Sequence, residues 1–99
     1  MTFVTTQTEI MAAAAGRLTG LGTELNTQNA AAMVPTSGVT PAAADEVSAL
    51  TAAQFASHAS VYQAVSAHAA AVHELFVSAL DASAGSYVAT ESANASSAI

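Results

Sequence analysis

The sequence has no cysteine and almost no basic residues, and both absences exclude classes of protein. Without cysteine, neither a disulfide framework nor a thiolate metal site can form. Arg17 is the only lysine or arginine, and the formal net charge is −6. Because phosphate contacts require several basic side chains, we do not expect nucleic-acid binding. An anionic membrane surface would also repel the chain.

A basic leader and a long apolar run are missing as well. Residues 1–7 contain neither feature, so we expect no cleaved Sec-type signal. The uncharged stretch 47–73 carries Gln54, His58, Gln63 and His68 among its alanines, which makes it a poor membrane span. If the protein leaves the cell, it must use another route.

Groups that could support catalysis are sparse. The imidazoles are His58, His68 and His73. The last two are five residues apart, about 140° round a helix, so they do not share a face well. The pair His73-Glu74 lacks the second histidine of a zincin motif. The sequence therefore predicts packed or surface histidines, no metal, no cofactor and no enzymatic activity.

Alanine dominates what is present, since it accounts for about half of the 53 % hydrophobic residues. Alanine favours helix strongly, but burying its methyl contributes only about 0.8 kcal/mol. Ordering a chain of this length costs on the order of 100 kcal/mol. We therefore expect a helical chain whose stability depends on burying its few large apolar side chains. The chain alone should be only marginally stable.

A first helix is predicted from about residue 7 to about residue 34. Thr6 and Glu9 fit a capping box, in which the hydroxyl and the carboxylate each accept from a backbone N–H at the helix start. Positions spaced by three and four then define one face. That face comprises Ile10, Ala14, Leu18, Leu21, Leu25, Gln28 and Ala32. Close approach by a neighbouring helix would be permitted by Gly16, Gly20 and Gly22.

A break over residues 35–41, bounded by two prolines, separates this helix from a longer one predicted over about 41–84. Thr40 is a candidate cap with Pro41 at the first helical position, and Gly85 suits the C-terminal end. The second helix would be about 60 Å long and the first about 40 Å. The short connection predicts antiparallel neighbours. The remaining residues, 85–99, are polar and small, and we expect a flexible tail.

The second helix carries two apolar stripes, whereas a helix with one neighbour needs only one. The first stripe runs Val47, Leu50, Gln54, His58, Val61, Val65, His68, Val72, Leu75, Ala79. The second runs Phe55, Ala59, Tyr62, Ser66, Ala69, His73, Phe76, Leu80. Two stripes indicate burial against the first helix and against a partner outside this chain. The alternative is a hairpin that assembles with itself into a helical bundle.

Two polar residues could contribute to such contacts. Gln54 could hydrogen-bond across an interface and set its register, or mark the wet edge of the stripe. Arg17 could pair with a carboxylate, although a solvated side chain fits its position better. The expected partner-binding residues are Ile10, Ala14, Leu18, Leu21, Leu25, Val47, Leu50, Gln54, Phe55, Val61, Tyr62, Val65, Val72, Phe76 and Leu80.

These features together resemble the mycobacterial PE domain. The resemblance is carried by the helix opening near Glu9, by segments 28–32 and 41–48, by the long second helix, and by Tyr87 four residues before Glu91. Segments 45–55 and 62–66 are especially similar to PE proteins handled by the fifth ESX system. The family is named for a Pro-Glu pair, and here Thr8 stands where the family has proline. The resemblance covers essentially the whole chain.

The resemblance implies a function that composition and periodicity do not supply. It implies a heterodimer with a PPE-family protein, in which two helices from each chain form a four-helix bundle. A cytosolic chaperone would recognise the PPE partner, and type VII secretion would export the pair to the cell surface or outer envelope. Tyr87 and Glu91 would serve as part of the export signal. We expect residues 1–84 to be the all-α hairpin, with no further domain to carry an enzymatic activity.

Overall fold

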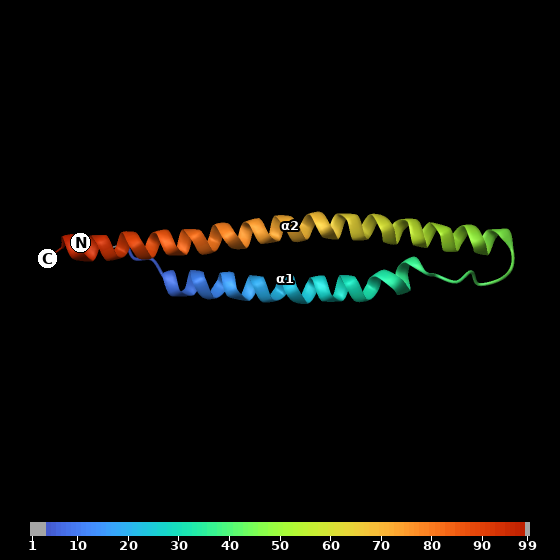
Figure 1. Cartoon of the computed structure of the whole chain (residues 1–99), viewed down its shortest axis with the longest axis horizontal. Coiled ribbons are helices and arrows are strands. Elements are labelled where there is room, and N and C mark those ends of the chain that lie inside the picture. The colour runs from blue at the N-terminus through green and yellow to red at the C-terminus, as the bar shows by residue number, and fades with distance from the viewer. Residues whose placement is uncertain (1–3, 99) are drawn as a thin grey trace.

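A computed structural model shows an extended hairpin of two antiparallel helices, and it describes residues 4–98. Helix α1 spans Thr8–Ser37 and helix α2 spans Glu46–Ser97, with no strand among the described residues. The molecule measures 81 × 21 × 15 Å, and both termini lie at the same end of the rod (Figure 1). The all-α hairpin expected from the sequence is confirmed.

The start of α1 differs from the predicted capping box. The residue that precedes the helix is Gln7, and it makes no side-chain cap hydrogen bond. Thr6 lies one residue too early to cap a helix that begins at Thr8, and its hydroxyl instead donates to Glu91 Oε1 at 3.3 Å. The predicted pairing of Thr6 with Glu9 is therefore wrong, although Glu9 still lies in the first turn, where its charge suits the helix dipole.

Helix α1 also continues past the predicted end at residue 34 and includes Pro35. A proline removes one backbone donor, but in the last turn this loss affects few hydrogen bonds. Hydroxyl groups add donors to the same turn: Thr36 Oγ1 donates to the Ala32 carbonyl at 2.5 Å, and Ser37 Oγ donates to the Met33 carbonyl at 2.7 Å. The proline therefore lies inside the final turn and does not end the helix.

Helix α2 begins five residues later than the sequence predicted, at Glu46 and not at 41. Asp45 is its N-cap: Oδ2 accepts from the Ser48 backbone N–H at 3.1 Å, and Oδ1 accepts from the Ser48 hydroxyl at 2.6 Å. These hydrogen bonds lower the pKa of Asp45 from its usual value of 3.8. A lowered pKa means that this cap stabilises the fold above pH 3.8 and is lost as the pH falls further. The predicted start at Thr40 and Pro41 is therefore wrong, because Asp45 caps the helix through its hydrogen bonds to Ser48.

The C-terminal end of α2 is the largest correction to the prediction. The helix passes through Gly85 and ends at Ser97, so residues 85–98 are not the flexible tail that we expected. Gly85 does not adopt a positive φ, so it does not form a left-handed cap. One glycine costs about 1 kcal/mol relative to alanine inside a helix, and the alanines that follow sustain the helix. Residues 85–97 form an overhang that extends beyond the start of α1 (Figure 1).

The two helices meet along a seam of mostly small side chains spaced alternately by three and four, the repeat typical of paired helices. On α2 the seam consists of Ala52, Ala56, Ala59, Gln63, Ser66, Ala70, His73, Val77, Leu80 and Ala84, all buried or half-buried. On α1 it consists of Thr8, Met11, Ala15, Leu18, Gly22, Asn29 and Ala32, with one interruption, since residues 23–28 are all exposed. Within residues 4–98, the buried hydrophobic residues are all alanines: Ala15, Ala52, Ala59 and Ala84.

Polar contacts between the helices fix the register of this seam. His73 Nε2 lies 2.6 Å from the Leu18 carbonyl oxygen, so the ring donates a hydrogen bond across the seam. Tyr62 donates its hydroxyl to Asn29 Oδ1 at 2.7 Å, and Gln63 Nε2 donates to the Asn29 carbonyl at 2.9 Å. Because hydrogen bonds are directional, these contacts specify which turns of the two helices face each other, which alanine methyls alone would not do.

The His73 contact depends on Gly22. A Cβ at position 22 would lie 2.8 Å from His73 Cδ2 and 2.9 Å from Nε2, so any larger residue displaces the imidazole from Leu18. Gly20 provides a matched control, since a Cβ there meets nothing within 4 Å. We predict that Gly20→Ala raises the melting temperature through helix propensity, worth about 0.5–1 kcal/mol. Gly22→Ala should raise the melting temperature by less than Gly20→Ala does, or lower it.

Circular dichroism melts of these two variants, each also made in a His73→Ala background, test the assignment. Removing the imidazole should restore the full gain of Gly22→Ala. Equal gains from both glycine substitutions in the presence of His73 would contradict a close contact at this point of the seam.

Candidate partner-binding surface

The structure leaves most of the expected partner-binding residues exposed on the hairpin. We refer to the exposed large apolar side chains of the two helices, apart from Met33 and Val34 at the end of α1 and Tyr87 and Val88 on the overhang, as the open apolar surface. On α1 it comprises Ile10, Leu21 and Leu25. On α2 it comprises Val47, Leu50, Phe55, Val61, Tyr62, Val65, Val72, Leu75 and Phe76. Even the large aromatic Phe55 is 60 % exposed, so the hairpin alone does not use these side chains as a core.

The two stripes predicted on α2 have different locations. Every position of the first stripe, including Gln54, is exposed. The second stripe straddles the edge of the seam: Ala59 is buried, Ser66, His73 and Leu80 are half-buried, and its aromatic members are exposed. The pairing of α1 with α2 therefore covers only part of one stripe. Ala14 and Leu18 of α1 are likewise half-buried.

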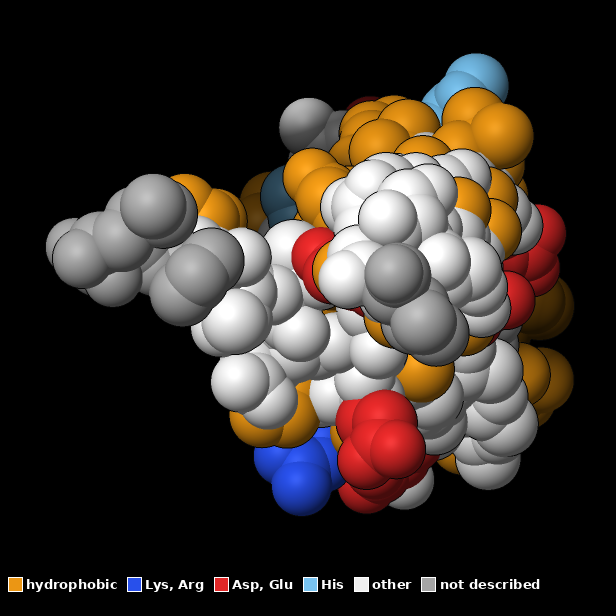
Figure 2. All heavy atoms as spheres, turned by 90° about the vertical axis from the view of Figure 1, so that its left-hand side faces the viewer, with side chains coloured by type: hydrophobic (Ala, Val, Ile, Leu, Met, Phe, Trp, Pro, Cys, Tyr) orange, Lys and Arg blue, Asp and Glu red, His pale blue; other side chains and the backbone are white. Residues whose placement is uncertain are grey.

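Side-chain size explains this arrangement. Glycine, serine and alanine at the seam let the backbones approach, and the larger residues flank the contact. In the end-on view of Figure 2, hydrophobic side chains gather on the upper side of the molecule, while acidic side chains lie beside this patch and also on the lower side. Burying a valine, leucine or phenylalanine contributes about 1.5–3 kcal/mol. The hairpin leaves this contribution unused at many positions.

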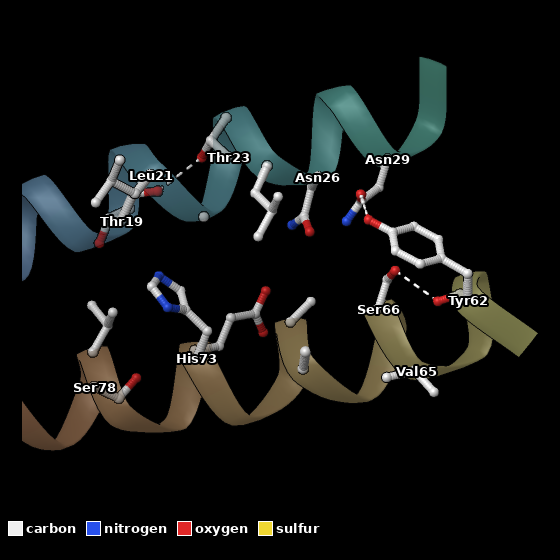
Figure 3. A pocket seen from close by; sticks show the side chains of 16 residues that line it. Thr19, Leu21, Thr23, Asn26, Asn29, Tyr62, Val65, Ser66, His73 and Ser78 are labelled. Carbon is white, nitrogen blue, oxygen red and sulfur yellow. Dashed lines mark hydrogen bonds between the residues drawn. The ribbon is translucent and has the colours of Figure 1, made fainter. Parts of the chain in front are cut away.

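A groove of about 710 Å³ crosses the middle of the hairpin between the helices. Small residues form part of its lining, among them Gly22, Ser66, Ala69 and Ala70, and larger apolar side chains also line it, namely Leu21, Leu25 and Val65. Figure 3 shows Tyr62 and His73 pointing from α2 toward α1 within this groove. Its size and mostly apolar lining suit the insertion of apolar side chains from another helix, as knobs enter holes in a coiled coil.

The groove does not assemble a recognisable catalytic group. His73 already donates to the Leu18 carbonyl, and the Ser66 hydroxyl donates to the Tyr62 carbonyl at 2.9 Å. Among residues 4–98, no three His, Asp or Glu side chains lie close enough together to hold a metal ion. In the same part of the chain, neither helix is apolar enough over a sufficient length to cross a bilayer.

The predicted signal residues lie on the overhang of α2. Tyr87 is 46 % exposed, and Glu91 accepts the Thr6 hydrogen bond. Both continue the seam spacing past Leu80 and Ala84, which places them on the side of α2 that faces α1. This continuity was not predicted, because the helix was expected to end at Gly85. The spacing of residues 80, 84, 87 and 91 by three and four is nevertheless visible in the sequence.

The close approach expected at Gly16, Gly20 and Gly22 occurs at Gly22, opposite His73, whereas the inter-helix roles of Asn29 and Gln63 were not predicted. No local pattern indicates them, because each depends on which turn of the other helix lies opposite. Thr6 was assigned to a helix cap, and its actual partner is 85 residues away in the sequence.

Comparison with known proteins supplies the family. Residues 4–94 match the PE family. The chain is 58 % identical to the PE family protein PE13 of Mycobacterium tuberculosis over 98 residues, 99 % of each chain. It is also 58 % identical to the PE-PGRS family protein PE_PGRS33 and 50 % identical to the esterase PE16 of the same organism. It covers only 19 % and 18 % of those two longer relatives. The chain therefore belongs to the PE family of mycobacterial proteins.

Proposed function

We propose that this PE protein is a pairing subunit: it forms a four-helix bundle with a PPE-family protein and is exported with it by type VII secretion. One observation carries the proposal, namely that the hairpin buries alanines and leaves most of its large apolar side chains exposed. A second helical hairpin laid against the open apolar surface would bury them. Contiguous exposed apolar surface of this kind marks an interaction site.

A heterologous partner fits the charge of the chain better than a second copy does. With seven acidic residues and one basic residue, the pairing of two copies would bring together two chains that each carry a net charge of −6. A partner with basic residues at its margins would gain favourable electrostatic contacts. The similarity of segments 45–55 and 62–66 favours the fifth ESX system as the exporter, with a cytosolic chaperone that recognises the PPE subunit.

The proposal assigns no catalysis to this chain. The esterase activity in the name of PE16 is that protein's own, and the present chain spans less than a fifth of its length. The proposed final location is the cell surface or outer envelope, reached after assembly in the cytosol.

A charge placed on the open apolar surface should prevent pairing. Val65 is 61 % exposed and lines the groove, and Val65→Asp would bury an unpaired carboxylate in the complex at a cost of several kcal/mol. We predict at least a hundredfold loss of affinity for the PPE partner. Ser60→Asp is the matched control, because this exposed residue lies about 140° round the helix from Val65.

Co-expression with a PPE-family protein, followed by affinity purification of the tagged PE chain, measures the effect. The Ser60 variant should retain the partner, and the Val65 variant should lose it. Retention of the partner by the Val65 variant would show that pairing uses another surface.

The proposed export signal makes a separate prediction. Tyr87→Ala and Glu91→Ala should leave the paired complex soluble and its melting temperature unchanged, because both residues lie on the overhang beyond α1. Each should strongly reduce the exported fraction, whereas the neighbouring exposed control Ser92→Ala should not. Immunoblots of cytosolic and exported fractions measure this. Normal export of both variants would end the signal assignment, and a lowered melting temperature for Tyr87→Ala would indicate a packing role.

A further inference from the structure

The N-terminal segment, residues 4–7, approaches the same side of the overhang that carries Tyr87 and Glu91. Helix α1 begins at Thr8, so it stops short of these residues, and the segment before it continues toward the end of α2. Figure 1 shows the thin stretch before α1 turning from the start of that helix toward the C-terminal turns of α2, where Thr6 contacts Glu91. The segment that precedes α1 therefore reaches the predicted export signal.

Thr6 makes the specific contact between these two ends. Its Oγ1 donates to Glu91 Oε1 at 3.3 Å. Within the segment, Thr6 is half-buried, whereas Val4, Thr5 and Gln7 are exposed, so its side chain is the one directed toward the protein. Because α1 begins one residue too late for Thr6 to cap it, the hydroxyl is available to Glu91.

We propose that Thr6, Tyr87 and Glu91 form one recognition surface, in which Thr6 positions the Glu91 carboxylate for the export machinery. This inference rests on the proposed function of Tyr87 and Glu91 as the export signal. A glutamate on an exposed helix samples many rotamers, and ordering its long side chain on binding has an entropic cost. A hydrogen bond to one oxygen reduces that cost and leaves the other oxygen free to accept.

The chemistry of this surface defines the partner that fits it. An ionised carboxylate only accepts hydrogen bonds, so the partner must supply a donor, and the acidic balance of the chain favours a guanidinium or ammonium group. Tyr87 and Val88 are each about half exposed beside it and require an apolar recess. The structure thus points to a protein surface that pairs a basic side chain with an apolar pocket.

Three substitutions separate a positioning role for Thr6 from a purely structural one. Thr6→Val keeps the shape of the side chain and removes the hydroxyl, Thr6→Ser restores the hydroxyl, and Thr5→Val repeats the same chemical change at an exposed neighbour. Each variant is made in the full chain co-expressed with its PPE partner. The exported fraction and the melting temperature of the complex are measured. We expect Thr6→Val to lower the exported fraction several-fold at unchanged melting temperature, and the other two variants to behave as the original protein.

Glu91→Ala in the same experiment distinguishes failure of this inference from failure of the proposed function. If Glu91→Ala blocks export while Thr6→Val exports normally, the positioning role is wrong and the signal stands. If Glu91→Ala itself exports normally, both are wrong. Increased export of Thr6→Val would mean that the segment covers the signal, which overturns the positioning role, as would a loss of melting temperature that matches the loss of export.

Discussion

The close packing of α1 against α2 along a seam of small side chains is the constraint on which the rest of the structure depends. Alanine at the buried positions lets two long helices lie side by side, but each methyl contributes only about 0.8 kcal/mol on burial. A seam of leucines would have buried more area and held the hairpin on its own. The small seam instead places the large apolar side chains on the flanks, where they remain exposed.

This constraint also explains the polar contacts between the helices. Alanine methyls alone would distinguish poorly between alignments that differ by one heptad, and polar residues in a seam of paired helices are what specify register. The contacts of His73 with Leu18 and of Tyr62 and Gln63 with Asn29 are directional and specify one alignment. Gly22 makes one of them possible by leaving room for the imidazole. The same alignment brings Leu21, Leu25 and Val65 to one groove, so the polar contacts shape the surface that we propose for the partner.

The helical hairpin and the presence of more apolar stripes than one neighbouring helix can cover were predictable from the sequence, because both depend on composition and periodicity. The position of the seam was not predicted, since buried residues such as Ala52 and Ala84 belong to neither stripe. The ends of the helices were not predictable in this way. Thr40-Pro41 and Asp45-Ser48 both offer a start for α2, and only the hydrogen bonds that Asp45 makes decide between them. Thr6 was read as a cap because its true acceptor, Glu91, is close only after the chain folds.

The tail shows the same limit of local reasoning. Glycine is common just after the end of a helix, but it ends the helix only where the left-handed conformation is more stable than another helical turn. Here alanine-rich sequence follows, and α2 continues to Ser97. As a result, Tyr87 and Glu91 are held on a helix face and are not carried on a free segment. This arrangement gives the proposed signal a defined geometry before the export machinery engages it.

The most direct test of the central claim, that the hairpin is incomplete without a heterologous helical partner, is to compare the purified chain alone with the chain co-expressed with a PPE-family protein. Analytical ultracentrifugation gives the stoichiometry, and calorimetry gives the cooperativity of unfolding. Our account predicts an aggregating or non-cooperatively melting chain when alone and a soluble one-to-one complex with a single sharp transition. A monodisperse monomer or homo-oligomer that melts cooperatively without any partner would contradict it.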